Sequence, residues 1–212
     1  MEAADLGPTV NIWGWTLAAI AGVFLALRCY CKVLMHRALW IDDWFLVASW
    51  LAILGSQTIV TFNTTIGMGK HSWLVPKGNL PTIARNQDII VSLSILALIW
   101  SKVSFSVSLL RLTSGYTRAF VWFAIVTTHI FLGVNVVLFW VQCTPIAKTW
   151  QPELAGTCWS MQIIVWYSIF SGAWSAVMDF SLALLPWKIL RHLPMEKREK
   201  IGVAVAMSLG IL

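Results

Sequence analysis

The sequence predicts an all-α membrane protein, a polytopic transmembrane helix bundle with five complete spans and a truncated sixth, in a single domain over residues 1–212. Hydrophobic residues make up 58% of the chain and charged residues 11%, with a mean hydropathy of +0.77, whereas a soluble domain carries about 25% charged residues. Several apolar runs reach the length of about 20 residues that a helix needs to cross a bilayer. Barrel strands would be about 10 residues long with alternating polarity, so these longer, continuous runs predict helices.

The apolar runs predict helices over residues 10–30, 44–66, 89–112, 119–141, 162–190 and 201–212. The first run follows no basic segment and is longer than the apolar part of a signal peptide, which indicates an uncleaved spanning helix. The last run would rise only about 18 Å at 1.5 Å per residue, which is too short to cross the bilayer core. We therefore expect the chain to be a C-terminally incomplete fragment.

Basic residues concentrate on one side of the predicted bundle. With the N-terminus outside, the outer segments hold four basic residues, which are Lys70, Lys77, Arg85 and Lys148. The inner segments hold the larger group, which consists of Arg28, Lys32, Arg37, Arg111, Arg118, Lys188, Arg191, Lys197, Arg198 and Lys200. Because Lys and Arg are enriched in cytoplasmic segments, we expect a multi-pass protein of the plasma membrane or an endomembrane with its N-terminus outside. The net charge of +6 then reflects topology, and the expected partner is the lipid bilayer, with no nucleic acid.

Two carboxylates, Asp42 and Asp43, stand directly before the second apolar run, after a basic segment. A helix start carries unsatisfied N–H groups and a partial positive charge, so we expect Asp42 to be the N-cap and Asp43 to lie in the first turn. Arg28, Lys32 and Arg37 are near enough in the chain to pair with both acids. A capped helix is the simpler interpretation, and a role in signalling or coupling is the alternative.

Several stretches match one known family in order along the chain. A basic segment followed by "DDW" opens an apolar helix, "GMGKH" supplies Gly67, Gly69 and His71, and "SKVSFSVSLLRL" carries Lys102 and Arg111. The later stretches are "QCTPIAKTW", "GTCW", "MDFSLALLPWKIL" with Pro186 and Trp187, and "EKIGVAVAMSLGIL". Over nearly all of its length, the sequence resembles the fungal rhodopsin-domain family of integral membrane proteins.

The resemblance implies a seven-helix protein, and the family includes receptor-like proteins of the G-protein-coupled type and membrane proteins from toxin and other secondary-metabolite gene clusters. It therefore implies a receptor-like sensor with a small-molecule ligand and a cytoplasmic signalling partner. The alternative is a non-receptor accessory or transport protein of a secondary-metabolite pathway. Two departures are that the chain stops before a seventh helix and that its short N-terminal tail lacks the cysteine-rich extracellular domain of some receptor-like members. A retinal photoprotein would need a Schiff-base lysine in the seventh helix, whereas Lys102 lies in the third.

The cysteines divide between the two sides of the membrane. Cys143 and Cys158 flank a predicted outer loop, where the oxidising environment favours a disulfide, and the resemblance supports this pairing. Cys29 and Cys31 lie at the cytoplasmic end of the first run, where we expect reduced, inert thiols, although such cysteines can also be palmitoylated.

Lys102 and Asp179 fall inside predicted spans, about 20 Å and 26 Å from the outer ends of their helices at 1.5 Å per residue. Intramembrane charges usually pair or face a wet cavity, so an ion pair between the third and fifth helices would satisfy both. The alternative is that each side chain reaches the headgroup region separately.

No enzyme motif is present in the sequence, because it contains no Gly-rich phosphate loop, no nucleophile elbow and no zinc-ligand spacing. The four histidines, His36, His71, His129 and His192, fall at different levels of the predicted bundle. We therefore expect no catalytic activity, no cofactor and no metal. Asn63 starts a glycosylation acceptor pattern, but it lies so close to the bilayer that we expect it to be unmodified.

Overall fold

Five long helices make up most of the part of the chain that the structure describes, and they confirm the predicted all-α fold class. The computed structural model describes the backbone of residues 6–34, 40–71, 73–111 and 113–192, with side chains as far as Leu185. The helices are α1 (Gly7–Leu34), α2 (Ile41–Thr65), α3 (Leu80–Leu110), α4 (Gly115–Val141) and α5 (Met161–His192). All five are long and apolar enough to cross a membrane. The predicted segment 201–212 lies outside the described residues.

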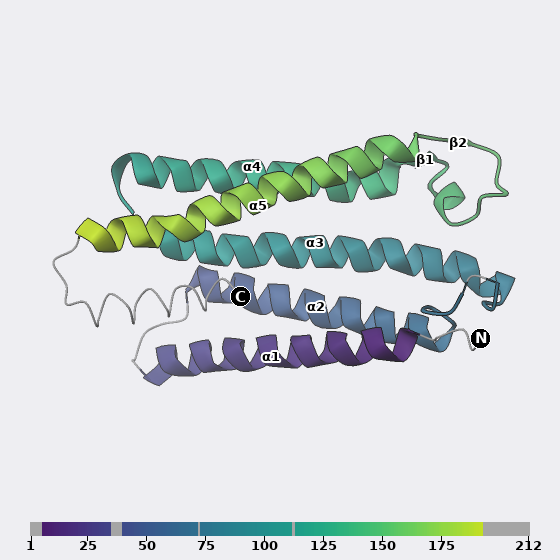
Figure 1. Cartoon of the computed structure of the whole chain (residues 1–212), viewed down its shortest axis with the longest axis horizontal. Coiled ribbons are helices and arrows are strands. Elements are labelled where there is room, and N and C mark those ends of the chain that lie inside the picture. Colours follow the sequence, from purple (N-terminus) through teal and green to yellow (C-terminus); the bar gives the residue numbers. More distant parts are fainter. Residues whose placement is uncertain (1–5, 35–39, 72, 112, 193–212) are drawn as a thin grey trace.

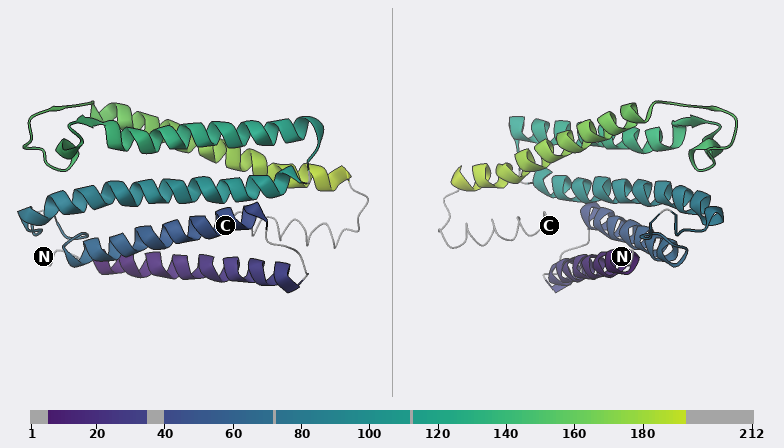
Figure 2. Two further views of the ribbon diagram at one scale, coloured as in Figure 1. Left: turned by 180° about the vertical axis from the view of Figure 1, so that it is seen from behind. Right: turned by 45° about the vertical axis from the view of Figure 1, so that its right-hand side comes forward.

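The helices run alternately up and down, and each packs against the next along the chain. Figure 1 shows α3 in the middle, with α1 and α2 on one side of it and α4 and α5 on the other, and the turned views of Figure 2 show the same order. A small core cluster joins α3, α4 and α5, and it consists of Leu109, Val121, Ala124, Met178 and Leu182. By contrast, α1 contacts mainly α2 and buries only Gly7 and Ala18 among its described residues.

The two ends of the bundle differ in structure. At one end, here called the hairpin end, lie the start of α1, the connection from α2 to α3 with the short helix η1 (Lys77–Asn79), and the loop between α4 and α5. That loop pairs β1 (Cys143–Thr144) with β2 (Thr157–Cys158) around the short helix η2 (Ile146–Thr149). The opposite end, here called the cluster end, holds the start of α2 and the end of α3.

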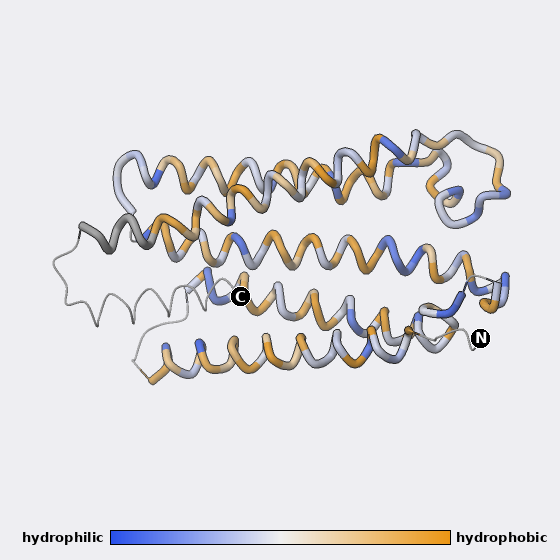
Figure 3. The backbone as a smooth tube through the Cα atoms, viewed as in Figure 1, coloured by the Kyte–Doolittle hydropathy of each residue, from blue (hydrophilic) through white to orange (hydrophobic). Residues whose placement is uncertain are grey.

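Figure 3 shows hydrophobic residues along the middle of every helix and hydrophilic residues mainly at the two ends and in the hairpin-end loops. Because backbone polar groups in lipid must be satisfied internally, continuous helices with such an apolar middle are the expected solution. Many large apolar side chains on α1, α4 and α5 are exposed, for example Ile12, Val23, Trp122 and Trp166. In a membrane these side chains would face lipid or further protein.

Helix α3 corrects one predicted boundary, because it begins at Leu80 and not at Ile89. Its first turns are polar, and Pro81 stands in the first turn, where proline is tolerated because the N–H group would be unpaired anyway. Hydropathy locates the apolar part of a helix, so it misses polar turns that project beyond the hydrocarbon. This correction moves Asp88 from a loop into the helix.

Candidate functional site

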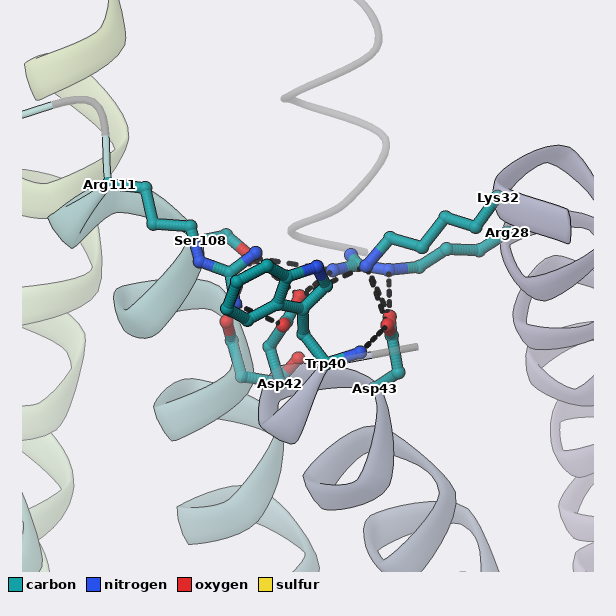
Figure 4. A network of polar contacts seen from close by, with 8 residues as sticks. Arg28, Lys32, Trp40, Asp42, Asp43, Ser108 and Arg111 are labelled. Carbon is teal, nitrogen blue, oxygen red and sulfur yellow. Dashed lines mark hydrogen bonds and ion pairs between the residues drawn. The ribbon is translucent and has the colours of Figure 1, made fainter. Parts of the chain in front are cut away.

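Asp42 and Asp43 form the centre of a charge cluster at the cluster end. They lie in the first turn of α2 and are 1% and 2% exposed. Figure 4 shows basic side chains converging on them, with Arg28 and Lys32 coming from α1 and Arg111 from just beyond the end of α3. The cluster therefore joins α1, α2 and α3 at one end of the bundle.

Arg28 and Lys32 pair with both carboxylates, as the sequence analysis expected. Lys32 Nζ lies 2.6 Å from Asp43 Oδ1 and 3.2 Å from Asp42 Oδ2. Arg28 donates from Nη2 to Asp42 at 3.1 Å and from Nε to Asp43 at 3.3 Å. The third expected partner, Arg37, lies outside the described residues.

The contribution of α3 comes from Arg111 and Ser108. Arg111 Nη2 lies 2.7 Å from Asp42 Oδ1, and its guanidinium carbon is 4.5 Å from the centre of the Trp40 ring. A cation over an indole face gains a further electrostatic attraction. Ser108 accepts from Arg28 and donates to Asp42, both at 3.3 Å. Two buried carboxylates are thus surrounded by three basic side chains that are themselves 22–41% exposed.

The predicted N-cap is wrong, because the residue that caps α2 is Trp40 and not Asp42. Trp40 is extended, and Asp43 supplies the side-chain contact by accepting from the Trp40 backbone N–H at 3.1 Å. This is the reach-back half of a capping box. Asp42 lies two residues beyond the capping position, and its carboxylate instead contacts the cations of α1 and α3.

Lys102 and Asp179 lie together between α3 and α5, away from the charge cluster. Lys102 Nζ is 2.5 Å from Asp179 Oδ2 and also donates to the hydroxyl of Ser175. Their side chains are 19% and 43% exposed. A cavity of about 10 Å³ beside the pair is also lined by Thr128 and His129, which is room for about one water molecule.

A much larger pocket lies at the hairpin end, among α3, α4, α5 and η2. Its volume is about 440 Å³, which is within the range of small-molecule sites. Its apolar lining comes mostly from α5, with one residue each from α3 and α4, and consists of Ala84, Phe139, Met161, Ile164, Val165 and Ile169. Its polar lining consists of Gln87, Asp88, Gln142, Thr149 and Ser168. Asp88 is half-buried and carries no ion pair within the part of the chain that the structure describes.

Comparison with protein-family models matches residues 27–212 to the fungal rhodopsin domain. The chain belongs to the fungal rhodopsin domain family. No curated protein and no solved structure is significantly similar to it. The match begins one residue before Arg28, so it covers the whole charge cluster, the Lys102–Asp179 pair and the hairpin-end pocket.

The glycine and histidine positions that suggested the fungal rhodopsin domain form a turn after α2. Gly67 and Gly69 have φ angles of +118° and +98°, a region that side chains rarely adopt. A Cβ at Gly69 would also lie 2.3 Å from the backbone nitrogen of Gly7. His71 stacks on Trp73 with ring centres 4.4 Å apart. Among the described residues, no group of three potential metal ligands forms, and these positions serve the turn.

The remaining positions singled out from the sequence are the two outer cysteines, the Pro-Trp pair of the fifth helix and the glycosylation pattern at Asn63. Cys143 and Cys158 form the disulfide that closes the β1–β2 hairpin. Pro186 and Trp187 lie in the last part of α5, where the structure describes the backbone only. Asn63 is fully buried and accepts from Asn86 at 2.8 Å, which leaves no room for a glycan.

Sequence reasoning missed Ser108, Ser175 and Asp88. Ser108 precedes Arg111 by three residues and Ser175 precedes Asp179 by four, and residues with these spacings share a helix face. Helical spacing could therefore have found both serines. Asp88 was missed because the predicted start of its helix lay one residue after it.

Proposed function

We propose that this fungal rhodopsin domain protein is a receptor-like membrane sensor. It takes a small-molecule ligand in the hairpin-end pocket and passes the signal to a cytoplasmic partner at the cluster end. The observation that carries the proposal is the pocket itself, which is concave, largely apolar and of ligand size, with a few polar groups that could orient a ligand. We propose no enzymatic activity, since the sequence contains no catalytic motif.

The difference in volume between the hairpin-end pocket and the cavity beside Lys102 favours a sensor over a transporter. The cavity beside Lys102 holds about 10 Å³, so a ligand that fills the 440 Å³ pocket cannot occupy that level without rearrangement. At the cluster end, α1, α2 and α3 are joined by the ion pairs of Asp42 and Asp43. A ligand could therefore act by shifting helices against one another, which requires that it bind two bundle conformations with different affinity.

The proposed orientation places the N-terminus and the hairpin end outside. The cluster end carries the basic residues Arg28, Lys32 and Arg111, which favour the cytoplasmic side. The disulfide lies at the opposite end, where an oxidising compartment would maintain it. A membrane-impermeant maleimide should therefore label the exposed thiol of Cys31 only after cells are permeabilised. Labelling of Cys31 in intact cells would reverse the orientation.

The sensor proposal is tested with Cys31 as a native reporter. The full chain with Cys29→Ser is labelled at Cys31 with an environment-sensitive fluorophore and placed in phosphatidylcholine nanodiscs. Binding of 3-phenylpropan-1-ol, a neutral probe small enough for the pocket, is measured by equilibrium dialysis alongside the fluorescence. We expect saturable binding with a matching fluorescence change, both abolished by Val165→Trp, which fills the pocket. The control, Ile163→Trp, changes an exposed residue of α5 that does not line the pocket and should preserve both.

Two results would contradict the proposal in different ways. Absence of saturable binding to the wild-type chain would reject the pocket as a ligand site. Binding without a fluorescence change, together with flux of the probe across proteoliposomes, would replace the sensor with a transporter.

A further inference from the structure

We infer that the hairpin-end pocket selects organic cations, and specifically an amphiphilic amine or quaternary ammonium compound; this inference rests on the proposed function of the pocket. The deciding feature is the carboxylate of Asp88. It lines a pocket whose other walls are mostly apolar, and it is half-buried without an ion pair in the described part of the chain.

The neighbouring cations do not neutralise Asp88. Arg85 is one turn earlier on α3, where it is exposed and does not line the pocket. Lys148 lies on η2 next to the lining residue Thr149, but its ammonium group donates to the Gly156 carbonyl at 2.6 Å. Among the described residues, the lining of the pocket therefore holds one acidic group and no basic one.

The other acidic groups of the helices behave differently. Asp42, Asp43 and Asp179 each have a Lys or Arg nitrogen within 3.3 Å. A carboxylate in an apolar setting is unfavourable unless it is paired, and this bundle supplies a partner from the protein at all three positions. At Asp88 no described residue supplies a partner and a ligand-sized space adjoins the carboxylate, so a bound ammonium group would supply it.

The shape of the lining also defines the rest of the ligand. Phe139, Ile164, Val165 and Ile169 offer an apolar surface that spans α4 and α5, and an aromatic ring also attracts a cation through its face. Gln87 and Gln142 offer amide groups for one or two hydrogen bonds. The fitting ligand thus combines one cationic group with an apolar body, whereas a carboxylate of the same shape would be repelled.

The test compares three molecules with one skeleton: 3-phenylpropylamine, 3-phenylpropan-1-ol and 3-phenylpropanoate. Their equilibrium dissociation constants are measured on the full chain in phosphatidylcholine nanodiscs, with empty nanodiscs subtracted. We expect the amine to bind about fivefold more tightly than the alcohol, as a partly exposed ion pair of about 1 kcal/mol gives, and the propanoate to bind more weakly than the alcohol.

Substitutions at Asp88 assign the preference to its carboxylate. Asp88→Asn should make the amine and the alcohol bind equally, and saturable binding of the alcohol shows that the variant is folded. Asp88→Glu should keep the amine preference, and Asp88→Lys should transfer it to the propanoate. Glu153→Gln, which removes an exposed acidic group that does not line the pocket, should leave the order of the three molecules unchanged.

The outcomes separate this inference from the proposed function. If the wild-type chain binds the amine and the alcohol equally, or if Asp88→Asn keeps the amine preference, the cation inference is overturned while the ligand site stands. If none of the three molecules binds saturably, the proposed function of the pocket fails first.

Discussion

The two ends of the bundle differ in whether their helix carboxylates form ion pairs with described residues. At the cluster end, Asp42 and Asp43 are almost fully buried and receive three basic side chains from α1 and α3. At the hairpin end, Asp88 is half-buried beside a pocket of about 440 Å³ and has no ion pair among the described residues. The difference indicates that Asp42 and Asp43 hold helices together, whereas Asp88 is available to pair with a ligand.

The largest loss in the free energy of unfolding is expected on removing the charge of Asp42, which has the most ion pairs of the acids that the structure describes. Asp42→Asn removes the carboxylate that pairs with Arg111 and leaves Arg28 and Lys32 with Asp43 alone among the described acids. Breaking a buried ion pair costs about 3–5 kcal/mol, so we expect a loss of at least about 3 kcal/mol in the free energy of unfolding. Titration with sodium dodecyl sulfate in mixed micelles measures it. Glu153→Gln, on an exposed loop residue, is the matched control and should unfold like the wild type.

The hairpin end is stabilised by a disulfide, whereas the cluster end is stabilised by ion pairs. Cys143 and Cys158 are separated by 15 residues, and closing a loop of that length is worth about 3 kcal/mol in the chain-entropy model. Reduction should lower the free energy of unfolding by about this amount. In unreduced, denatured protein, maleimide should label Cys29 and Cys31 only. Modification of all four cysteines under those conditions would show that the bridge does not form.

The Lys102–Asp179 pair is expected to have a smaller effect, because Asp179 is 43% exposed. Lys102→Met and Asp179→Asn should each lower the free energy of unfolding by about 1–2 kcal/mol, since polar contacts inside membrane bundles are weaker than fully buried pairs. The double variant should recover much of the loss, because it leaves no lone charge. Strict additivity of the two losses, measured by the same titration, would show that the side chains act independently.

The sequence predicted the five helices because each has an apolar run long enough for the bilayer, and such runs leave few alternatives. It also predicted that Arg28 and Lys32 would meet Asp42 and Asp43, since these charges stand at adjoining ends of consecutive helices. The assignment of the N-cap failed because the capping residue lies two positions before Asp42, and each residue of register rotates a helix by about 100°. Asp43, and not Asp42, therefore reaches back to the capping position.

The hairpin-end pocket was beyond sequence reasoning. Its lining comes from α3, α4, α5 and η2, and hydropathy gives no information on which faces of these helices meet. Within the described residues, Asp88 lacks an ion pair because of where Arg85 and Lys148 point, and their order in the chain does not decide that. In contrast, Lys102 and Asp179 could be matched because they are isolated charges at similar depth in helices of the same direction.

The central claim, that paired acids hold the bundle and the unpaired acid serves a ligand, is tested most directly by unfolding Asp42→Asn and Asp88→Asn side by side without ligand. A paired carboxylate stabilises the fold, whereas an unpaired one in an apolar pocket does not. We therefore predict that Asp42→Asn loses at least about 3 kcal/mol, while Asp88→Asn stays within about 0.5 kcal/mol of the wild type. Equal losses in the two variants, or a larger loss in Asp88→Asn, would contradict the account.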